Sequence, residues 1–212
     1  MVTGAEIPGP PTPFDALTHV LPGGSILHRV HNQRRAGNMF NPGIGAPTRF
    51  APFTTATGPV PTLYAAATPE VAVSESILHG VPLSGGILPY ASYAALVETT
   101  LELQRPVRLA KLMGDGLRRL GITPQQLTAT SGDVYDRTVL WARAAHEAGF
   151  DGLAWMSARD NTAEAYVLFG DRISAEDLAV TGAGIGPFAS GTAGFPWLSA
   201  YCSRVRVELL IA

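Results

Sequence analysis

The sequence has few of the features that would link it to an oxidising compartment, a membrane or nucleic acid. Its 212 residues include one cysteine, Cys202, so no intrachain disulfide can form, and a reducing cytoplasm fits. The chain opens with no signal-peptide pattern, and no stretch approaches the roughly 18 to 20 apolar residues that span a bilayer. A formal net charge of -2 argues against direct nucleic-acid binding. We therefore expect a cytoplasmic protein without membrane or nucleic-acid contacts.

Metal-binding patterns are absent as well. His28 and His31 are three residues apart in a strand-like stretch, so their rings should point to opposite faces, and no other Cys/His cluster supports a metal site. Apolar residues make up 46% of the chain and charged residues 15%, which is enough apolar material for a sizeable core in one domain.

The order of the expected elements favours an α+β fold. Thr68-Pro69-Glu70 predicts a helix start, with a capping side chain, a proline at the first helical position and an acid in the first turn. Two further helices are expected over residues 114–120 and 131–147. Strand patterns cover residues 25–31, 62–67, parts of 90–104, 106–112, 152–156, 165–169 and 203–211. Because strands and helices do not alternate strictly, we expect a mostly antiparallel central sheet with a few helices.

Three segments lack regular patterns. Residues 1–25 are rich in proline and glycine, which predicts an irregular lead-in. Residues 32–62 form a stretch too long for an ordinary connection, and such loops are usually functional. Residues 182–194 are a Gly-rich loop that lacks the strand–helix context of a dinucleotide fingerprint.

Two arginines are candidates for holding a phosphate. Arg29 lies in a strand pattern and Arg49 follows a Gly/Pro loop. Each alone is more often an ordinary solvent-facing residue, but two guanidinium forks beside a Gly-rich loop suit a pyrophosphate.

Glu75 and Tyr64 are candidates for stabilising and orienting a sugar-containing ligand. Glu75 is expected in mid-helix on a largely apolar face, where a carboxylate lies either at the rim or is buried for a reason. Such a carboxylate can stabilise an oxocarbenium-like transition state. Tyr64 is either a core residue with a wet hydroxyl or an aromatic plate for a ligand ring.

Ser157 and Arg159 follow the expected end of a buried strand, where polar side chains can face a cleft. A plain turn is the simpler interpretation, because Ser157 is followed by Asp160 and Asn161. No Gly-x-Ser-x-Gly elbow surrounds Ser157, so we expect it to hydrogen-bond to a ligand rather than act as a nucleophile.

Together these residues resemble the RES domain family over roughly residues 26–170. The resemblance rests on short motifs in a shared order: His28-Arg29-Val30, Arg49-Phe50, Leu63-Tyr64-Ala65-Ala66, Glu75, Asp151-Gly152-Leu153, Ser157-Ala158-Arg159 and Val167-Leu168-Phe169. By this resemblance residues 1–25 are a lead-in, 26–170 the catalytic domain and 171–212 an extension that packs on the same domain.

The resemblance implies an ADP-ribosyltransferase-like fold and a toxin of a two-gene toxin–antitoxin system. Such toxins cleave the nicotinamide–ribose bond of NAD by phosphorolysis or hydrolysis, and their partner is an Xre-type antitoxin with a helix-turn-helix. NAD would be a substrate rather than a cofactor, with inorganic phosphate as a co-substrate in the phosphorolytic case. Glu75, Arg49 and Tyr64 would be catalytic, and NAD would be bound by Arg29, Arg49, Tyr64, Ser157 and Arg159.

Three alternatives stay open at the level of sequence. One is a toxin that transfers ADP-ribose to a protein. Another is a non-catalytic module that binds an ADP-ribose-like ligand or another protein. The third is a structural subunit whose interface is the Gly-rich C-terminal segment. In each case a homodimer or a hetero-oligomer with an antitoxin is compatible with the low charge and with the Phe195-Pro196-Trp197 segment.

Overall fold

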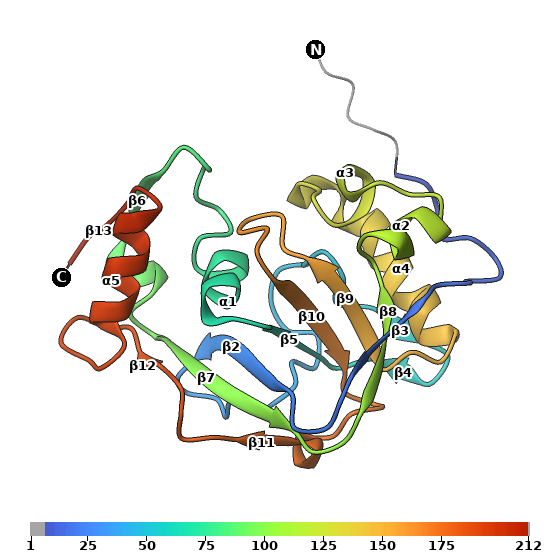
Figure 1. Ribbon diagram of the computed structural model, residues 1–212, viewed down its shortest axis with the longest axis horizontal. Coiled ribbons are helices and arrows are strands. Elements are labelled where there is room, and N and C mark those ends of the chain that lie inside the picture. Colours follow the sequence, from blue (N-terminus) through green and yellow to red (C-terminus); the bar gives the residue numbers. More distant parts are fainter. Residues whose placement is uncertain (1–6, 212) are drawn as a thin grey trace.

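A nine-stranded sheet carries the fold of the computed structural model, which describes residues 7–211 (Figure 1). Its strands in spatial order are β1 (Thr18–Leu21), β8 (Val107–Lys111), β9 (Gly152–Met156), β10 (Glu164–Phe169), β5 (Thr62–Ala66), β2 (Ile26–Asn32), β7 (Leu96–Leu103) and β11 (Leu178–Val180), with β12 (Gly186–Pro187) also paired to β7. All pairs in this sheet are antiparallel except β8 with β9. The expected α+β fold with a mostly antiparallel central sheet is confirmed.

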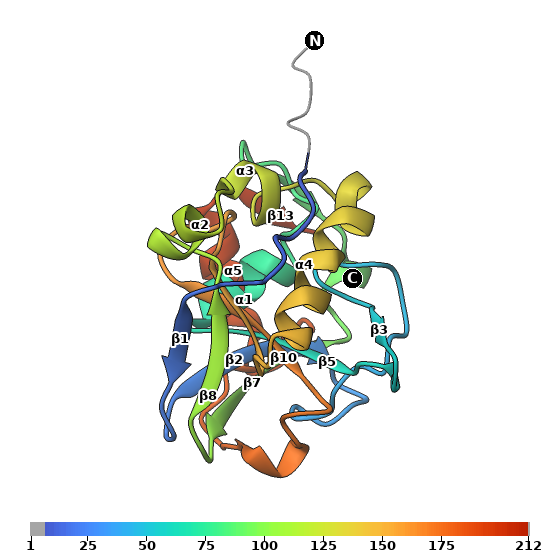
Figure 2. The same cartoon turned by 90° about the vertical axis from the view of Figure 1, so that its right-hand side faces the viewer.

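The helices and short elements flank this sheet. The described residues form α1 (Pro69–Ser76), α2 (Asp115–Arg119), α3 (Pro124–Leu127), α4 (Tyr135–Glu147) and α5 (Phe195–Arg204), with 3-10 turns η1 (Tyr90–Ser92), η2 (Gly132–Val134) and η3 (Ala175–Asp177). Two small ribbons pair β6 (Gly86–Leu88) with β13 (Val207–Leu209) and β3 (Thr54–Thr55) with β4 (Gly58–Pro59). Figure 1 shows α2, α3 and α4 gathered on one side and α5 with β6 and β13 on the other, with α1 between them. Figure 2 views the molecule from the side of α2, α3 and α4.

Helix α1 is packed against the rest of the molecule on two sides. The Thr68 hydroxyl accepts a hydrogen bond from the Val71 N–H (3.3 Å), and Pro69 begins the helix, as the sequence predicts. Val71 packs with the cluster that contains Trp141 and Trp155, whereas Val73 packs with the cluster that contains residues of α5. Helix α1 is therefore wedged between the sheet and the C-terminal helix, which fixes the directions of its polar side chains.

Two expectations at the ends of the chain differ from the structure. Strand β1 lies within the segment expected to be irregular, of which residues 1–6 are outside the described part. Its register against β8 runs from Thr18 opposite Ala110 to Leu21 opposite Val107, so it extends the edge of the sheet. Proline and glycine residues predict irregular structure for this segment, but they lie before and after the strand and do not interrupt it.

The strand expected over residues 203–211 is wrong in extent. Helix α5 continues to Arg204, and only Val207–Leu209 is a strand. Leu198, Tyr201 and Cys202 are buried with helical spacing, and Pro stands at the start of the helix, which explains the helical outcome. Residues 171–212 also supply β11 and β12 to the central sheet. No helix among the described residues is long and apolar enough to cross a membrane.

Candidate active site

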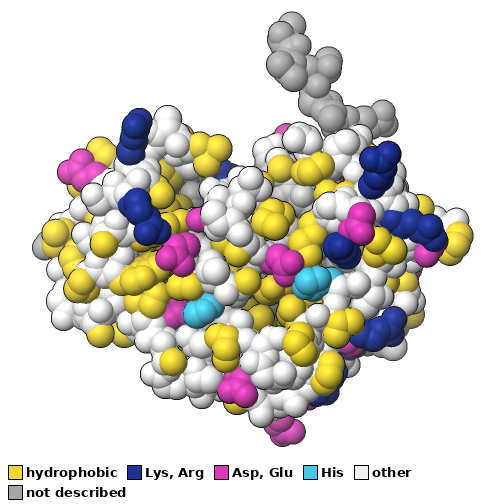
Figure 3. All heavy atoms as spheres, viewed as in Figure 1, with side chains coloured by type: hydrophobic (Ala, Val, Ile, Leu, Met, Phe, Trp, Pro, Cys, Tyr) yellow, Lys and Arg dark blue, Asp and Glu magenta, His cyan; other side chains and the backbone are white. Residues whose placement is uncertain are grey.

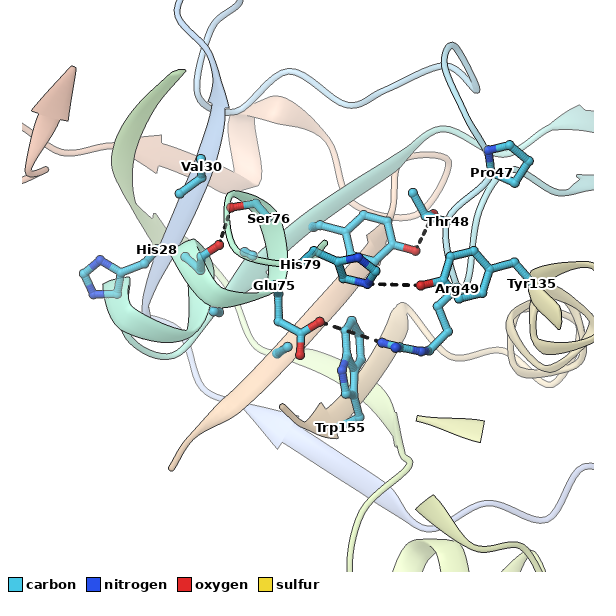
Figure 4. A pocket seen from close by; sticks show the side chains of 15 residues that line it. His28, Val30, Pro47, Thr48, Arg49, Glu75, Ser76, His79, Tyr135 and Trp155 are labelled. Carbon is cyan, nitrogen blue, oxygen red and sulfur yellow. Dashed lines mark hydrogen bonds and ion pairs between the residues drawn. The ribbon is translucent and has the colours of Figure 1, made fainter. Parts of the chain in front are cut away.

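A cavity of about 460 Å³ opens between α1, β5, the loop before Phe50 and the start of α4 (Figure 4). Its size is in the range of small-molecule sites, and its wall is largely apolar with a few convergent polar groups. The side chains with polar atoms in its lining belong to His28, Thr48, Arg49, Tyr64, Glu75, Ser76, His79, Tyr135 and Trp155. Figure 4 shows Glu75, near the end of α1, and His79, in the turn after it, facing Arg49 and Tyr135 across the cavity.

Glu75 is held by two neighbours from distant parts of the chain. The Ser157 hydroxyl donates a hydrogen bond to its Oε1 (2.7 Å), and Arg49 Nη1 lies 3.7 Å from its Oε2. The Glu75 side chain is 14% exposed, so the carboxylate reaches the cavity but has little freedom. Ala72, Glu75 and Ser76 share one face of α1 by their helical spacing and all line the cavity, which explains why Glu75 points inward.

Ser157 is fully buried at the start of the turn that follows β9. Its oxygen accepts hydrogen bonds from the backbone N–H groups of Arg159 and Asp160 (3.2 Å each). With both lone pairs used, the hydroxyl hydrogen is left for Glu75, and the orientation of the carboxylate is fixed. Ser157 therefore acts on the cavity through Glu75, since it does not itself line the wall.

Arg49 is buried by the segment that leads into α4. Its Nη2 donates to the Thr130 carbonyl (3.2 Å), Nε lies 3.5 Å from the Thr130 hydroxyl, and the guanidinium stands over the Tyr135 ring at 5.7 Å from its centroid. The Thr138 hydroxyl donates to the Arg49 carbonyl (2.5 Å), so the backbone is fixed as well. The cation is thus pre-positioned beside Glu75 before any ligand enters.

Tyr64 presents its ring to the cavity while its hydroxyl holds the preceding loop. The hydroxyl accepts from the Phe50 N–H (3.0 Å) and shares a hydrogen bond with Thr48 (2.9 Å). The ring meets Trp155 edge-on at 6.1 Å. Burial raises the pKa of Tyr64 to about 12, so the phenol stays protonated at neutral pH.

His79 and Tyr135 form a bridge across the cavity, with 3.1 Å between His79 Nε2 and the Tyr135 hydroxyl (Figure 4). Burial lowers the pKa of His79, and the positive charges of Arg159 and Arg49 lower it further. A neutral imidazole is therefore the prevailing form at neutral pH.

The structure places Arg29 in a different cavity. Its Nη1 donates to the carbonyls of Gly37 and Met39 (2.7 Å each), and burial lowers its pKa to about 10. Because neighbouring side chains of β2 alternate between faces, His28 lines the cavity of Glu75, whereas Arg29 lines an adjacent one of about 320 Å³. The two cavities share Val30, Thr48 and Tyr64 as a common wall.

Arg159 also lies outside the cavity of Glu75. It lines a third cavity, of about 380 Å³, on the side of α1 where Ser74 points. Of the six positions singled out from sequence, the structure brings together Arg49, Tyr64, Glu75 and Ser157. It sets Arg29 and Arg159 on either side of them.

Sequence reasoning overlooked several residues of the wall. His79 could have been found, since it follows Glu75 by four residues, although the structure places it in the turn after α1 rather than in the helix. His28, whose Nδ1 lies 2.9 Å from a buried Glu98 oxygen, entered the sequence analysis as a possible metal ligand and as part of a family motif, but not as a residue of the cavity wall. Tyr135 and Trp155 carried no local signal, because their roles come from tertiary packing. Among the described residues, no group of three or more His, Cys, Asp and Glu side chains could hold a metal ion.

Fold and site together define an α+β domain with a carboxylate, a buried arginine and a tyrosine around one small-molecule cavity. A family model for the RES domain matches residues 26–189. The chain belongs to the RES domain family. The match continues beyond the expected limit of residue 170 and includes β11 and β12.

A solved structure with a similar fold is that of the M. tuberculosis MbcT–MbcA toxin–antitoxin complex. The matching chain is 14% identical in sequence with a TM-score of 0.57, over 88% of this chain and 91% of that one. At this identity the likeness concerns the fold. No curated protein matches the chain in sequence.

Proposed function

We propose that this protein is the toxin of a two-gene toxin–antitoxin system and that it cleaves the nicotinamide–ribose bond of NAD. The observation that supports this most is the fixed Glu75 carboxylate, held by Ser157 at 2.7 Å and facing Arg49 at 3.7 Å, in the wall of a cavity of about 460 Å³. A small-molecule cavity with an oriented carboxylate suits chemistry in which positive charge develops on a sugar ring.

The reaction needs little proton transfer on the leaving side. When the bond from the ribose carbon to the pyridinium nitrogen breaks, its electron pair neutralises the nitrogen, and nicotinamide leaves as a neutral base. Positive charge then develops on the ribose, where Glu75 stabilises it electrostatically. An acceptor oxygen forms the new bond to that carbon: phosphate gives a phosphorylated ADP-ribose, and water gives ADP-ribose with release of a proton.

The other residues position the reactants in this proposal. Arg49 holds an NAD phosphate or the incoming phosphate through its fork of N–H donors. Tyr64 orients the nicotinamide ribose with its ring, and Ser157 keeps Glu75 in place. Arg29 and Arg159 line the neighbouring cavities, so they reach NAD only where its ends extend past the cavity of Glu75. NAD is consumed as a substrate, and no cofactor is needed.

The proposed partner is an antitoxin of the Xre type with a helix-turn-helix. Support comes from family membership and from the likeness to a chain solved within a toxin–antitoxin complex. An antitoxin segment lying over the cavity would exclude NAD. Binding of the purified antitoxin should therefore suppress turnover in proportion to its occupancy.

Proton NMR of NAD with the purified chain tests the activity, run with and without inorganic phosphate. Nicotinamide release only with phosphate identifies a phosphorylase, and release in both conditions identifies a glycohydrolase. Absence of release by the folded protein rejects both and leaves transfer of ADP-ribose to a protein, or ligand binding without catalysis. Labelled NAD with candidate acceptor proteins separates those two.

A further inference from the structure

The third cavity of about 380 Å³ is a groove on the opposite side of α1 from Glu75. It lies between the segment of residues 81–84, the turn after β9 and the end of α5 with β13. Three guanidinium groups line it, from Arg159, Arg204 and Arg206, and we call it the arginine groove. The polar side chain of α1 at this groove is Ser74, directly before Glu75 in sequence.

The positive charge of the arginine groove is compensated only in part, since Asp160 and Glu70 are the acids near its three arginines. Within residues 7–211, the side chains of Arg159 and Arg206 form no hydrogen bond or ion pair, and Arg204 has only a contact of 3.8 Å with Glu70. The acid in the groove, Asp160, already accepts a hydrogen bond from the Tyr201 hydroxyl (3.0 Å). Guanidinium forks around a concave surface, two of them without a side-chain partner among the described residues, suit carboxylates or phosphates.

Apolar surface alternates with these cations. Leu78 and Val207 are largely buried in the lining, and Leu83, on the segment that borders the groove, is 77% exposed. In Figure 3, dark blue basic side chains lie at the upper left, in the region of α5, with yellow apolar and magenta acidic side chains beside them. A ligand that fits this surface carries negative charges close to an apolar group.

The aromatic ring in the groove lining, that of Tyr201, already has partners. The ring of Tyr201 is stacked on Trp197 at 5.5 Å, and the Arg204 guanidinium lies 5.1 Å from its centroid. No aromatic face in the groove lining is left to stack on a base, which disfavours a nucleotide. A single phosphate ion would fill only part of this cavity of about 380 Å³, and it would gain no favourable contact from the apolar side chains at the border.

We propose that the arginine groove docks an acidic segment of a partner protein. Carboxylates of that segment pair with Arg159, Arg204 and Arg206, and an apolar side chain between them packs on Leu83. The groove borders the turn that holds Ser157, so a docked partner lies next to the cavity of Glu75 without entering it.

Fluorescence anisotropy with a labelled short peptide of alternating glutamate and leucine tests this on the full chain. The control peptide has glutamine in place of glutamate. The acidic peptide should bind and the control should not, and added salt should weaken binding. Arg204→Gln with Arg206→Gln should weaken binding about a hundredfold, since each charge-assisted contact contributes about tenfold.

A matched double variant separates the groove from general charge attraction. Arg34→Gln with Arg118→Gln removes the same charge from exposed residues elsewhere and should leave peptide affinity within about twofold. Equal losses in the two double variants, or no binding of the acidic peptide to the intact protein, would overturn the proposal.

The kinetics of the NAD reaction provide a second, independent measurement. The Michaelis constant for NAD should be the same in the Arg204→Gln/Arg206→Gln variant and the intact chain, and a raised constant would mean that NAD itself occupies the groove. If the chain consumes no NAD, the proposed function fails, while the peptide titration still decides whether the groove binds acidic segments.

Discussion

Replacing Glu75 by glutamine is the sharpest test of the proposed chemistry. Glutamine keeps the shape of the side chain, and its amide oxygen can still accept the hydrogen bond that Ser157 now donates at 2.7 Å. What is lost is the negative charge. At the 3.7 Å that separates Glu75 from Arg49, a unit charge pair in a partly exposed site interacts by about 4 kcal/mol.

Only part of that energy acts on the transition state. The ribose carries less than a full charge, and Arg49 already offsets part of the carboxylate. About 3 kcal/mol is therefore the expected loss of transition-state stabilisation, which lowers kcat on the order of a hundredfold. The Michaelis constant should change little, because the uncharged glutamine keeps the shape of the cavity wall.

The fold should survive this change. Loss of the ion pair leaves Arg49 with Thr130 and Tyr135 as partners. We expect a cost of about 1–2 kcal/mol and a Tm lower by roughly 2–8 °C. Glu147→Gln, which removes a carboxylate from an exposed pair on α4, is the matched control and should leave turnover unchanged. If Glu75→Gln released nicotinamide at the rate of the intact chain, the electrostatic role of Glu75 would be refuted.

Three further predictions concern its neighbours. Arg49→Ala should weaken NAD binding at least about tenfold by calorimetry, because a buried fork is lost, and equal affinity would reject a phosphate role. Ser157→Ala should destabilise the fold by about 2 kcal/mol in urea unfolding, since Glu75 loses its donor and two backbone N–H groups lose their acceptor; an unchanged midpoint would contradict this. The pKa of His79 is lowered in the folded protein, so the unfolded chain binds a proton more readily as the pH drops below about 6.5. The free energy of unfolding should therefore fall on acidification through this range. In thermal melts, His79→Gln should reduce that loss of stability at acid pH.

The sequence predicts the local structure around Glu75 well, because the signals there are local. Thr68 and Pro69 define the start of α1, and the spacing of Ala72, Glu75 and Ser76 defines its inner face. The contact between Glu75 and Ser157 is different in kind. It depends on the order β9, β10 and β5 in the sheet, which brings the end of β9 next to the helix that follows β5.

Arg29 shows why motif order alone does not define a site. Strand alternation predicts that His28 and Arg29 face opposite ways, yet only the packed structure shows which face meets Glu75. The side chain of Arg29 donates hydrogen bonds to the carbonyls of Gly37 and Met39. An arginine in a family motif can therefore organise the long loop beside the cavity, a role that residue type and spacing do not distinguish from ligand binding.

The C-terminal helix α5 connects the segment that carries Glu75 with the segment that carries Ser157, although it lies outside the residues matched by the family model. Asp160 can only accept, so the Tyr201 hydroxyl donates to it at 3.0 Å, and the Ser74 hydroxyl must then donate to Tyr201 at 2.6 Å. Ser74 precedes Glu75, and Asp160 follows Ser157 by three residues. A single buried phenol from α5 thus joins the backbone segments that carry Glu75 and Ser157. The contact of 2.7 Å between Glu75 and Ser157 is therefore supported by α5 as well as by the sheet, and the structural unit that holds this pair extends beyond residue 189.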